Sequence, residues 1–398
     1  MLGREPRRGF SIDRERAREI VRELARRHGL AVNPDALVET LPVGIRQRVE
    51  LLRELVREPA ILLLDEPTAA LAPSEIDAFF TTVRALAAHG TAIMIVTHKL
   101  AEVVAYSRRV TVMRAGAIVA RFETATTDVD AIARAMVGGE VPPLVARAAT
   151  VPVPRLVVRE LRAKNEAAEL HAAALRVCAG EIVGIAGVEG NGQSLLADAI
   201  AGTIGYTGEM SLDGEPLAST LGPGARLMRG IRVIPQDRTH EALVLDWSLS
   251  DNVALGRQRT APLQRGGVID RGVAARYARD VIERFDVRPP NPSVIVGMLS
   301  GGNQQKVVVG RALADAPQLI VAYQPTRGID IGAGTLVQSR LIEARNAGAA
   351  VLLISFELDE IFALADRVYV MFGGRFVGEF ARGTIDRGRI GALMAGGV

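Results

Sequence analysis

A glycine-rich stretch in the second half of the chain has the composition of a phosphate-binding loop. Gly187–Ser194 fits the pattern G-x-x-x-x-G-K-[ST], except that Gln193 replaces the lysine. In such a loop the glycines let consecutive backbone N–H groups turn toward phosphate oxygens at the start of a helix, and Ser194 is placed to ligate magnesium. Because Gln193 brings no positive charge to the β- and γ-phosphates, we expect weakened binding. The residues expected to contact nucleotide are Gly187, Gly190, Asn191, Gly192, Gln193 and Ser194.

A second motif, Leu299–Lys306, reads Leu-Ser-Gly-Gly-Asn-Gln-Gln-Lys. It resembles the signature sequence of ATP-binding-cassette (ABC) ATPases, which closes over the γ-phosphate of a nucleotide held by the opposite domain. Ser300 is suited to cap a helix that starts near Asn303, and the glycines admit a phosphate oxygen close to the backbone. The resemblance implies nucleotide contacts for Ser300, Gly301, Gly302 and Gln304.

An acidic pair ends an aliphatic run in the first part of the chain. Asp65 and Glu66 follow Ile61–Leu64 and resemble the Walker B element of the same family. The resemblance implies that Asp65 organises magnesium and that Glu66 polarises the attacking water as a general base. His98, which follows Glu66 by 32 positions, stands where a histidine of the family contacts the γ-phosphate and senses hydrolysis.

Two further assignments depend on the resemblance alone. Gln236, in Val233–Arg238, stands where the family's Q-loop contacts magnesium and relays its state to the transmembrane partner. Asp330, in Thr326–Asp330, resembles the D-loop at the contact between the two nucleotide-binding domains. The first part of the chain has Ala72 at the position that corresponds to Asp330.

These motifs belong to an internal repeat. One constant offset of 258 residues relates three pairs of segments: Leu41–Gln47 to Leu299–Gln305, Asp65–Thr68 to Tyr323–Thr326, and Thr97–His98 to Ser355–Phe356. Three landmarks at one offset indicate two copies of one structural unit.

The chemically disabling replacements sort by site. The second copy has Tyr323, Gln324 and Phe356 in place of the first copy's carboxylates and histidine, and an amide cannot accept the proton of water. In the first copy, Pro42 and Val43 replace the serine and first glycine of the signature. One expected site therefore combines Asp65, Glu66 and His98 with Ser300, Gly301 and Gly302, and the other combines the Gly187–Ser194 loop with the altered residues.

The elements that position the motifs alternate between strand and helix. Short aliphatic runs that end in polar residues predict buried parallel strands, and helix-forming segments lie between them. The predicted strands are Ile61–Leu64, Ile93–Val96, Ile182–Ala186, Leu319–Ala322 and Val351–Ile354, and the predicted helices are Glu75–Ala88, Leu195–Ala201 and Leu336–Ala347. This alternation predicts an α/β fold, which the motifs identify as the P-loop NTPase fold of ABC ATPases in two tandem cassettes.

The offset also predicts the domain organisation. Residues 1–140 form the C-terminal part of a first cassette, residues 141–155 a proline-rich linker, and residues 156–398 a second cassette that is complete but degenerate. The first copy's counterpart of Gly187 would lie before Met1, so we expect roughly a hundred residues of the first cassette to be missing there.

Composition excludes several classes of protein. The single cysteine, Cys178, excludes a disulfide framework and a cysteine-rich zinc site. No apolar run approaches the roughly 20 residues that span a bilayer. The 48 Lys and Arg residues oppose 45 Asp and Glu residues and are interspersed with them, so we expect no nucleic-acid partner.

The pattern as a whole resembles the ATPase subunits of bacterial importers for monosaccharides and nucleosides. The sequences of its motifs are more similar to those of the nucleoside importers. The resemblance implies ATP and Mg²⁺ as cofactors, transmembrane permease subunits as partners, a substrate-binding protein as an indirect partner, dimerisation of ABC domains, and a cytoplasmic position on the inner face of the membrane. We expect the chain alone to bind ATP weakly and hydrolyse little. The alternatives are a non-catalytic truncated remnant and a soluble tandem ABC protein that acts on ribosomes.

Overall fold

The computed structural model describes residues 3–38, 41, 43–68, 71, 73–114, 116–140, 142–149, 153–166, 168–258, 261–384 and 386–397. The chain divides into two compact units. One comprises Met1–Thr111 with Arg121–Val129, and the other Val112–Ala120 with Asp130–Val398. In the described part of the chain, no helix is both long and apolar enough to cross a membrane.

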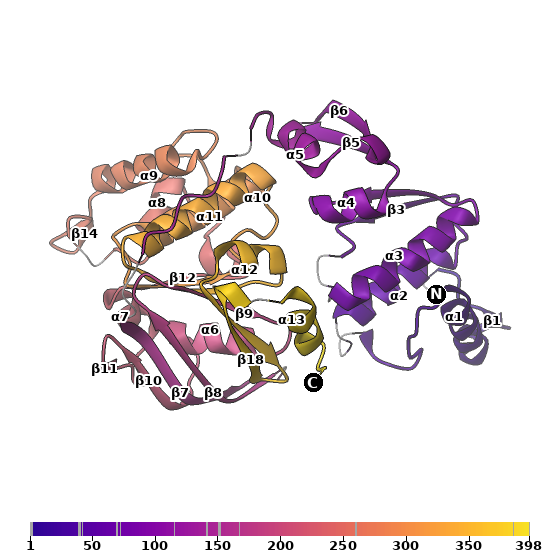
Figure 1. Cartoon of the computed structure of the whole chain (residues 1–398), viewed down its shortest axis with the longest axis horizontal. Coiled ribbons are helices and arrows are strands. Elements are labelled where there is room, and N and C mark those ends of the chain that lie inside the picture. Colours follow the sequence, from indigo (N-terminus) through magenta and orange to yellow (C-terminus); the bar gives the residue numbers. More distant parts are fainter. Residues whose placement is uncertain are drawn as a thin grey trace. The chain divides into compact units, whose positions relative to one another are not determined.

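A six-stranded sheet forms the centre of the second unit (Figure 1). Its order is β12 (Ile231–Ile234), β15 (Leu319–Tyr323), β16 (Ala350–Ile354), β9 (Ile182–Ala186), β17 (Arg367–Phe372) and β18 (Arg375–Ala381). All neighbours pair in parallel except β17 and β18. Every residue of β9, β15 and β16 is buried, which explains why these strands read as unbroken aliphatic runs.

Both faces of this sheet are covered. On one face, α6 (Gln193–Ala201) packs between the sheet and an antiparallel sheet with the order β11 (Glu215–Pro216), β10 (Thr207–Leu212), β7 (Pro154–Lys164) and β8 (Glu169–Cys178). Further helices that contact the sheet include α10 (Gly301–Leu313), α11 (Ile331–Asn346) and α12 (Leu358–Leu364). Separate apolar cores lie on the α6 side and on the α10–α11 side.

The remaining elements of the second unit connect these layers. They are α7 (Pro223–Met228), the π-helix η3 (Arg238–Ala242), α8 (Leu249–Ala254), β13 (Gln264–Arg265), β14 (Val268–Ile269), α9 (Arg271–Phe285), the 3₁₀-helices η4 (Val296–Met298) and η5 (Arg382–Thr384), and α13 (Arg387–Met394). β13 and β14 form a hairpin ahead of α9, whose first turn is capped by the Asp270 side chain.

The first part of the chain has fewer strands. Its elements are β1 (Arg7–Arg8), β2 (Ser11–Ile12), α1 (Arg14–His28), α2 (Val43–Leu55), β3 (Ile61–Asp65), α3 (Pro73–Ala88), β4 (Ala92–Val96), α4 (Leu100–Tyr106), β5 (Arg109–Arg114), β6 (Ala117–Glu123), the 3₁₀-helix η2 (Thr124–Thr126) and α5 (Val129–Val137). β3 and β4 form a parallel pair, and β5 and β6 an antiparallel pair. β5 and β6 extend across the division between the two units.

The predicted repeat is confirmed element by element. From α2 to β6, each helix and strand begins 258 residues before its counterpart among α10, β15, α11, β16, α12, β17 and β18. The hairpin β1–β2 and helix α1 precede β13, β14 and α9 by 257 residues, so the repeat also includes elements that the motifs did not mark. Among the described residues, the first copy has no counterpart of β9, α6 or the antiparallel sheet.

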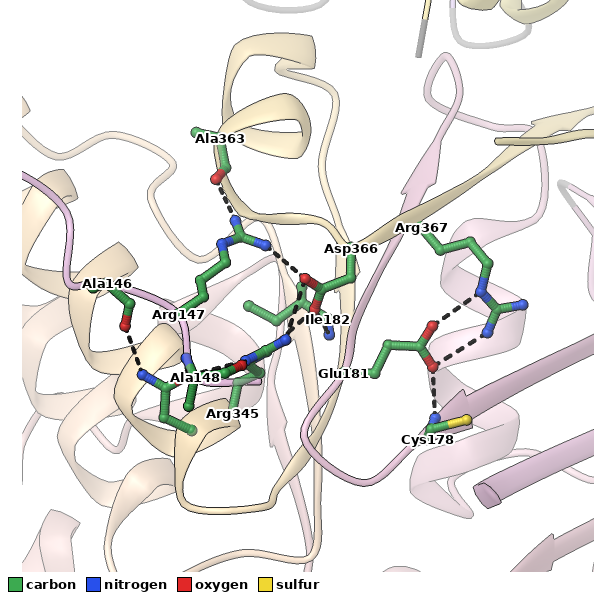
Figure 2. A network of polar contacts seen from close by, with 11 residues as sticks. Ala146, Arg147, Ala148, Cys178, Glu181, Ile182, Arg345, Ala363, Asp366 and Arg367 are labelled. Carbon is green, nitrogen blue, oxygen red and sulfur yellow. Dashed lines mark hydrogen bonds and ion pairs between the residues drawn. The ribbon is translucent and has the colours of Figure 1, made fainter. Parts of the chain in front are cut away.

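The segment between the copies is held on the second unit (Figure 2). The Arg147 guanidinium donates to the Asp366 carboxylate at 2.8 Å and to the Ala363 carbonyl, and the Ala148 carbonyl accepts from Arg345. The second Asp366 oxygen accepts from the backbone N–H of Ile182 at 2.9 Å. The same aspartate therefore joins the linker to the first residue of β9, which leads into the glycine-rich loop.

Candidate nucleotide site

The glycine-rich loop lies between a buried strand and a helix start, as the sequence predicts. β9 ends at Ala186, and α6 begins at Gln193. Gly190 and Gly192 have φ values of +91° and +99°, a left-handed region that glycine adopts at little cost. The first N–H groups of a helix have no partner within it, so this turn directs donors and the positive end of the helix dipole toward one point.

Gln193 lies folded back across the loop. Its side chain is buried, and Nε2 donates to the Val188 carbonyl at 3.0 Å. Gly187 leaves the necessary space, because a Cβ atom there would lie 2.4 Å from Gln193 Nε2. Gln193 Oε1 is buried without a hydrogen-bond partner, which is costly for a polar atom. The neutral amide therefore occupies the interior of the loop where the usual pattern has a lysine.

Two other side chains hold the loop in place. Asn191 Nδ2 donates to the Val188 carbonyl at 2.9 Å, and its Oδ1 accepts from the backbone N–H of Gly373 in the β17–β18 turn. Gln236 follows β12 and donates through Nε2 to Glu189 Oε1 at 3.0 Å. The structure thus brings the predicted Q-loop residue to the glycine-rich loop. The sequence reasoning missed Glu189, a carboxylate within the loop itself.

An aromatic pair lies at the ends of β15 and β16, where the first copy has the predicted site residues Asp65 and His98. Tyr323 and Phe356 contact edge to face, with ring centroids 6.1 Å apart. Burial raises the pKa of the Tyr323 hydroxyl, so this group stays protonated at neutral pH. Gln324 is also buried, and its Nε2 has no hydrogen-bond partner. Apolar packing occupies the positions at which the first copy has Asp65 and His98.

The second signature begins α10. Ser300 caps the helix by accepting from the backbone N–H of Asn303 at 3.4 Å. Gly301 leaves room for the Arg238 guanidinium, because a Cβ atom there would lie 2.5 Å from Arg238 Nη2. Gln304 is buried and donates to the Val296 carbonyl at 3.2 Å. Gly302 lies in the first turn of α10, close to Asp330, which caps α11 by accepting from Ala333 N at 2.9 Å.

Arg238 is a candidate that the sequence reasoning missed. Its Nη1 donates to the Arg327 carbonyl at 3.3 Å, and its guanidinium lies against Gly301 and Gly328. This places a permanent positive charge beside the start of the signature helix, where phosphate oxygens are expected. The residue stands two positions after Gln236, and no spacing pattern in the sequence points to its contact with the signature.

Carboxylate and imidazole meet in the first copy. Glu66 follows β3 with a φ of +45° and donates its N–H to the Val96 carbonyl at 2.9 Å. Its Oε1 lies 2.9 Å from His98 Nδ1, and both side chains are partly exposed. Asp65 is exposed at the end of β3. Glu66 and His98 therefore contact each other, as their strand-end positions imply, and Asp65 immediately precedes Glu66 at the end of β3.

Pro42 and Ala72 lie outside the described residues, and nothing is described of the side chains of Val43 and Gly44, with which α2 begins. The expected loss of the first signature stays a prediction.

Comparisons with known proteins agree with these motifs. A family model described as "ABC transporter" matches residues 4–69 and 170–327. The chain is 38% identical to the nucleoside import ATP-binding protein NupA of Lactococcus lactis, over 100% of this chain and 79% of that protein. It is 40% identical to the guanosine import ATP-binding protein NupO of Bacillus subtilis, over 100% of this chain and 78% of that protein. It is 37% identical to the ribose import ATP-binding protein RbsA 1 of Rubrobacter xylanophilus, over 100% of this chain and 79% of that protein.

Solved structures share the fold. A nucleotide-free ATP-binding cassette from an ABC transporter superimposes with a TM-score of 0.50 and 23% identity, over 57% of this chain and 92% of that chain. A dimeric cassette in a post-hydrolysis state, bound to ADP and phosphate, superimposes with a TM-score of 0.50 and 21% identity, over 57% of this chain and 98% of that chain. At this identity the likeness concerns the fold alone.

Proposed function

Because the chain belongs to the ABC transporter family of ATP-binding proteins, we propose that it binds ATP and energises a membrane importer for nucleosides or sugars. The similarity along the whole chain to importer ATP-binding proteins, nucleoside importers among them, supports the proposal. The turns after β3 and β15 also match in geometry, with positive φ at Glu66 and Gln324, while only the first copy has a carboxylate at this position.

Nucleotide binds at Gly187–Ser194 in this proposal. The N–H groups at the start of α6 and the left-handed glycines favour the β- and γ-phosphates. Gln193 must move from its contact with Val188 or accept phosphate beside it, and it brings no charge. Both effects weaken binding relative to a loop that carries lysine.

Magnesium fits the two copies differently. The ion neutralises phosphate charge when it is bound. At the Gly187–Ser194 loop it would depend on Ser194 and Gln236, because Tyr323 and Gln324 offer no carboxylate. In the first copy the exposed Asp65 carboxylate, next to Glu66, suits a hard cation. We therefore assign the metal-assisted chemistry to Asp65 and expect nucleotide at the glycine loop to be nearly independent of magnesium.

Hydrolysis is assigned to Glu66 with His98. Glu66 Oε1 accepts the proton of the attacking water as a general base, and the contact with His98 Nδ1 orients the carboxylate. In this proposal Ser300, Gly301 and Gly302 are the signature residues of the hydrolytic site and Asp330 serves the domain contact. Gln236 belongs with the Gly187–Ser194 loop, which it contacts through Glu189. A phosphate loop opposite this signature must come from outside the described first-copy elements, so the chain alone turns over little ATP.

The transport partners follow from the same proposal. Permease subunits dock on the chain, a substrate-binding protein acts through them, and the chain lies on the inner face of the membrane. Paired ABC domains close on ATP and open after hydrolysis.

Equilibrium binding of ATP to the full chain, measured by titration calorimetry with magnesium and with EDTA, tests the nucleotide assignment. We expect weak binding that EDTA leaves unchanged and that Gln193→Glu, which adds a negative charge inside the loop, abolishes. Binding that EDTA eliminates would contradict the assignment of magnesium, and binding unaffected by Gln193→Glu would contradict the assignment of the loop.

A further inference from the structure

The glycine-rich loop contains a carboxylate of its own. Glu189 is partly buried, and its Oε1 accepts a hydrogen bond from Gln236 Nε2 at 3.0 Å. Gln236 is neutral, so this contact fixes the position of the carboxylate and leaves its negative charge in place. Because like charges repel more strongly where water is partly excluded, Glu189 opposes the binding of any anion in the loop.

The charge of Glu189 reaches the end of β15. Burial raises the pKa of the Tyr323 hydroxyl, and the Glu189 carboxylate is the next strongest cause of this shift. The carboxylates of Asp198 and Glu241 act in the same direction, and Arg327 opposes them. Arg327 is exposed, so solvent screens its charge. The surroundings of the loop toward β15 are therefore negative.

The guanidinium of Arg238 does not balance this charge. Its Nη1 donates to the Arg327 carbonyl at 3.3 Å, and its Nε donates to Gln304 Oε1 at 3.5 Å. Its Nη2 lies against Gly301, where a Cβ atom would be 2.5 Å away. These contacts commit the guanidinium to the start of α10.

The side chains of the loop offer phosphate no replacement for the missing lysine. Gln193 is 1% exposed, and its Nε2 donates to the Val188 carbonyl, as does Asn191 Nδ2. Gln193 Oε1 has no hydrogen-bond partner, and as an acceptor it gives a phosphate oxygen nothing to bind. The attraction for phosphate therefore comes from the backbone N–H groups at the start of α6, which act as about half a unit of positive charge.

These charges affect nucleoside diphosphates and triphosphates differently. Both offer a β-phosphate to the N–H groups of α6, and only the triphosphate adds a γ-phosphate with at least about one further negative charge. That charge is attracted by about half a unit at the helix end and repelled by the full unit on Glu189. The third phosphate should therefore lower the affinity of the loop.

We infer that the Gly187–Ser194 loop selects nucleoside diphosphates over nucleoside triphosphates, and that Glu189 is the residue that discriminates between them. The inference rests on the proposed nucleotide site and names the class of ligand that this site prefers. ADP is the product of the hydrolysis assigned to Glu66, so the loop takes the product of that reaction in preference to its substrate.

Titration calorimetry of the full chain with ADP and with ATP, both in EDTA, tests the inference. We expect ADP to bind at least about tenfold more tightly than ATP. Glu189→Gln keeps the length of the side chain and an acceptor for Gln236 but removes the charge, so it should bring the two affinities to within about threefold of each other. The matched variant Glu209→Gln, which removes an exposed carboxylate on β10, should keep the native ratio.

Two results would overturn the inference alone: ATP that binds the native chain as tightly as ADP does, and a Glu189→Gln variant that retains the native preference. Failure of both nucleotides to bind would instead overturn the proposed site, and the inference with it. Because Glu189→Gln is expected to gain affinity for ATP, a loss of folded protein cannot produce the expected result.

Discussion

The two copies have the same backbone at the end of the same strand and different chemistry on it. Glu66 and Gln324 have φ values of +45° and +53°, and their N–H groups donate to Val96 and Ile354, which are also 258 residues apart. The strained turn is therefore retained where the carboxylate predicted to be catalytic is replaced by an amide. The turn therefore does not depend on that carboxylate.

A buried polar brace behind the turn is also common to both copies. Thr68 donates to Glu102 at 2.7 Å, and Thr326 donates to Glu360 at 2.8 Å. The surroundings differ in charge, because Lys99 lies 3.9 Å from Glu102 while Glu357 stands at the equivalent position in the second copy. Both copies therefore retain the hydrogen bond, but a positive side chain near it in the first copy is replaced by a negative one in the second.

The largest expected difference concerns Val321 and Leu63, which occupy equivalent positions of β15 and β3. Val321→Asp places an unpaired carboxylate in a closed core and should lower the free energy of unfolding by more than about 3 kcal/mol. The matched Leu63→Asp changes an exposed position and should stay within about 0.5 kcal/mol. Urea unfolding of the full chain measures both. Equal losses would mean that the two positions are equally buried.

The next largest effect concerns the phosphate loop. Gln193→Lys restores a positive charge beside the phosphates, and a hydrogen bond to a charged group contributes about 1.5–3 kcal/mol, or roughly tenfold to a hundredfold in affinity for ATP. Gln193→Met removes the amide without adding charge and serves as the control. Titration calorimetry that finds no difference between the two variants would contradict the assignment of this loop.

A smaller effect is expected at the linker, which has no equivalent partner in the first copy because Arg108 stands at the position of Asp366. Arg147→Ala removes the contacts with Asp366 and Ala363 but leaves Arg345 paired with the aspartate, so we expect a loss of about 1–2 kcal/mol in the second cassette. Hydrogen exchange at β9 should increase. Arg159→Ala, at an exposed pair, is the control, and equal effects would contradict the role of the linker.

The smallest effect is a pH dependence. Burial raises the pKa of the Glu360 carboxyl above its unfolded value of about 4.3. The contribution of this group to the free energy of unfolding is therefore fully present below that pH and is lost as the pH rises through the raised pKa. Glu360→Gln stays neutral, and its Tm relative to the native chain should increase from about pH 4.5 to about pH 8. Glu209→Gln, at an exposed position, should show no such trend. A constant difference for Glu360→Gln would contradict this account.

Local motifs were predictable from the sequence because they depend on short-range geometry. The strand predicted over Leu319–Ala322 lies within β15, and the strand predicted over Ile182–Ala186 coincides with β9. The helix predicted over Leu336–Ala347 begins five residues earlier, at Ile331, because Asp330 caps it. The sequence analysis assigned Asp330 to the D-loop and did not consider it as the N-cap, so it placed the start of α11 too late.

Contacts between distant segments were not predictable. Nothing in the spacing indicates that Arg238 fits beside Gly301, that Tyr323 and Phe356 pair, or that Asp366 joins the linker to β9. These contacts depend on tertiary packing. The 258-residue repeat relates equivalent positions of the two copies, but it does not indicate which contacts form where the side chains differ. The domain boundaries predicted at residues 140 and 156 stay predictions.

In the proposed function the hydrolytic groups of the first copy and the phosphate loop of the second belong to different sites, so the chain alone is predicted to bind ATP but to hydrolyse little. ATP turnover by the purified full chain, compared with its Glu66→Gln variant, tests this claim most directly. We predict nucleotide binding with turnover that is equally low in both proteins. Robust turnover by the native chain that Glu66→Gln abolishes, with no other ABC protein present, would contradict it.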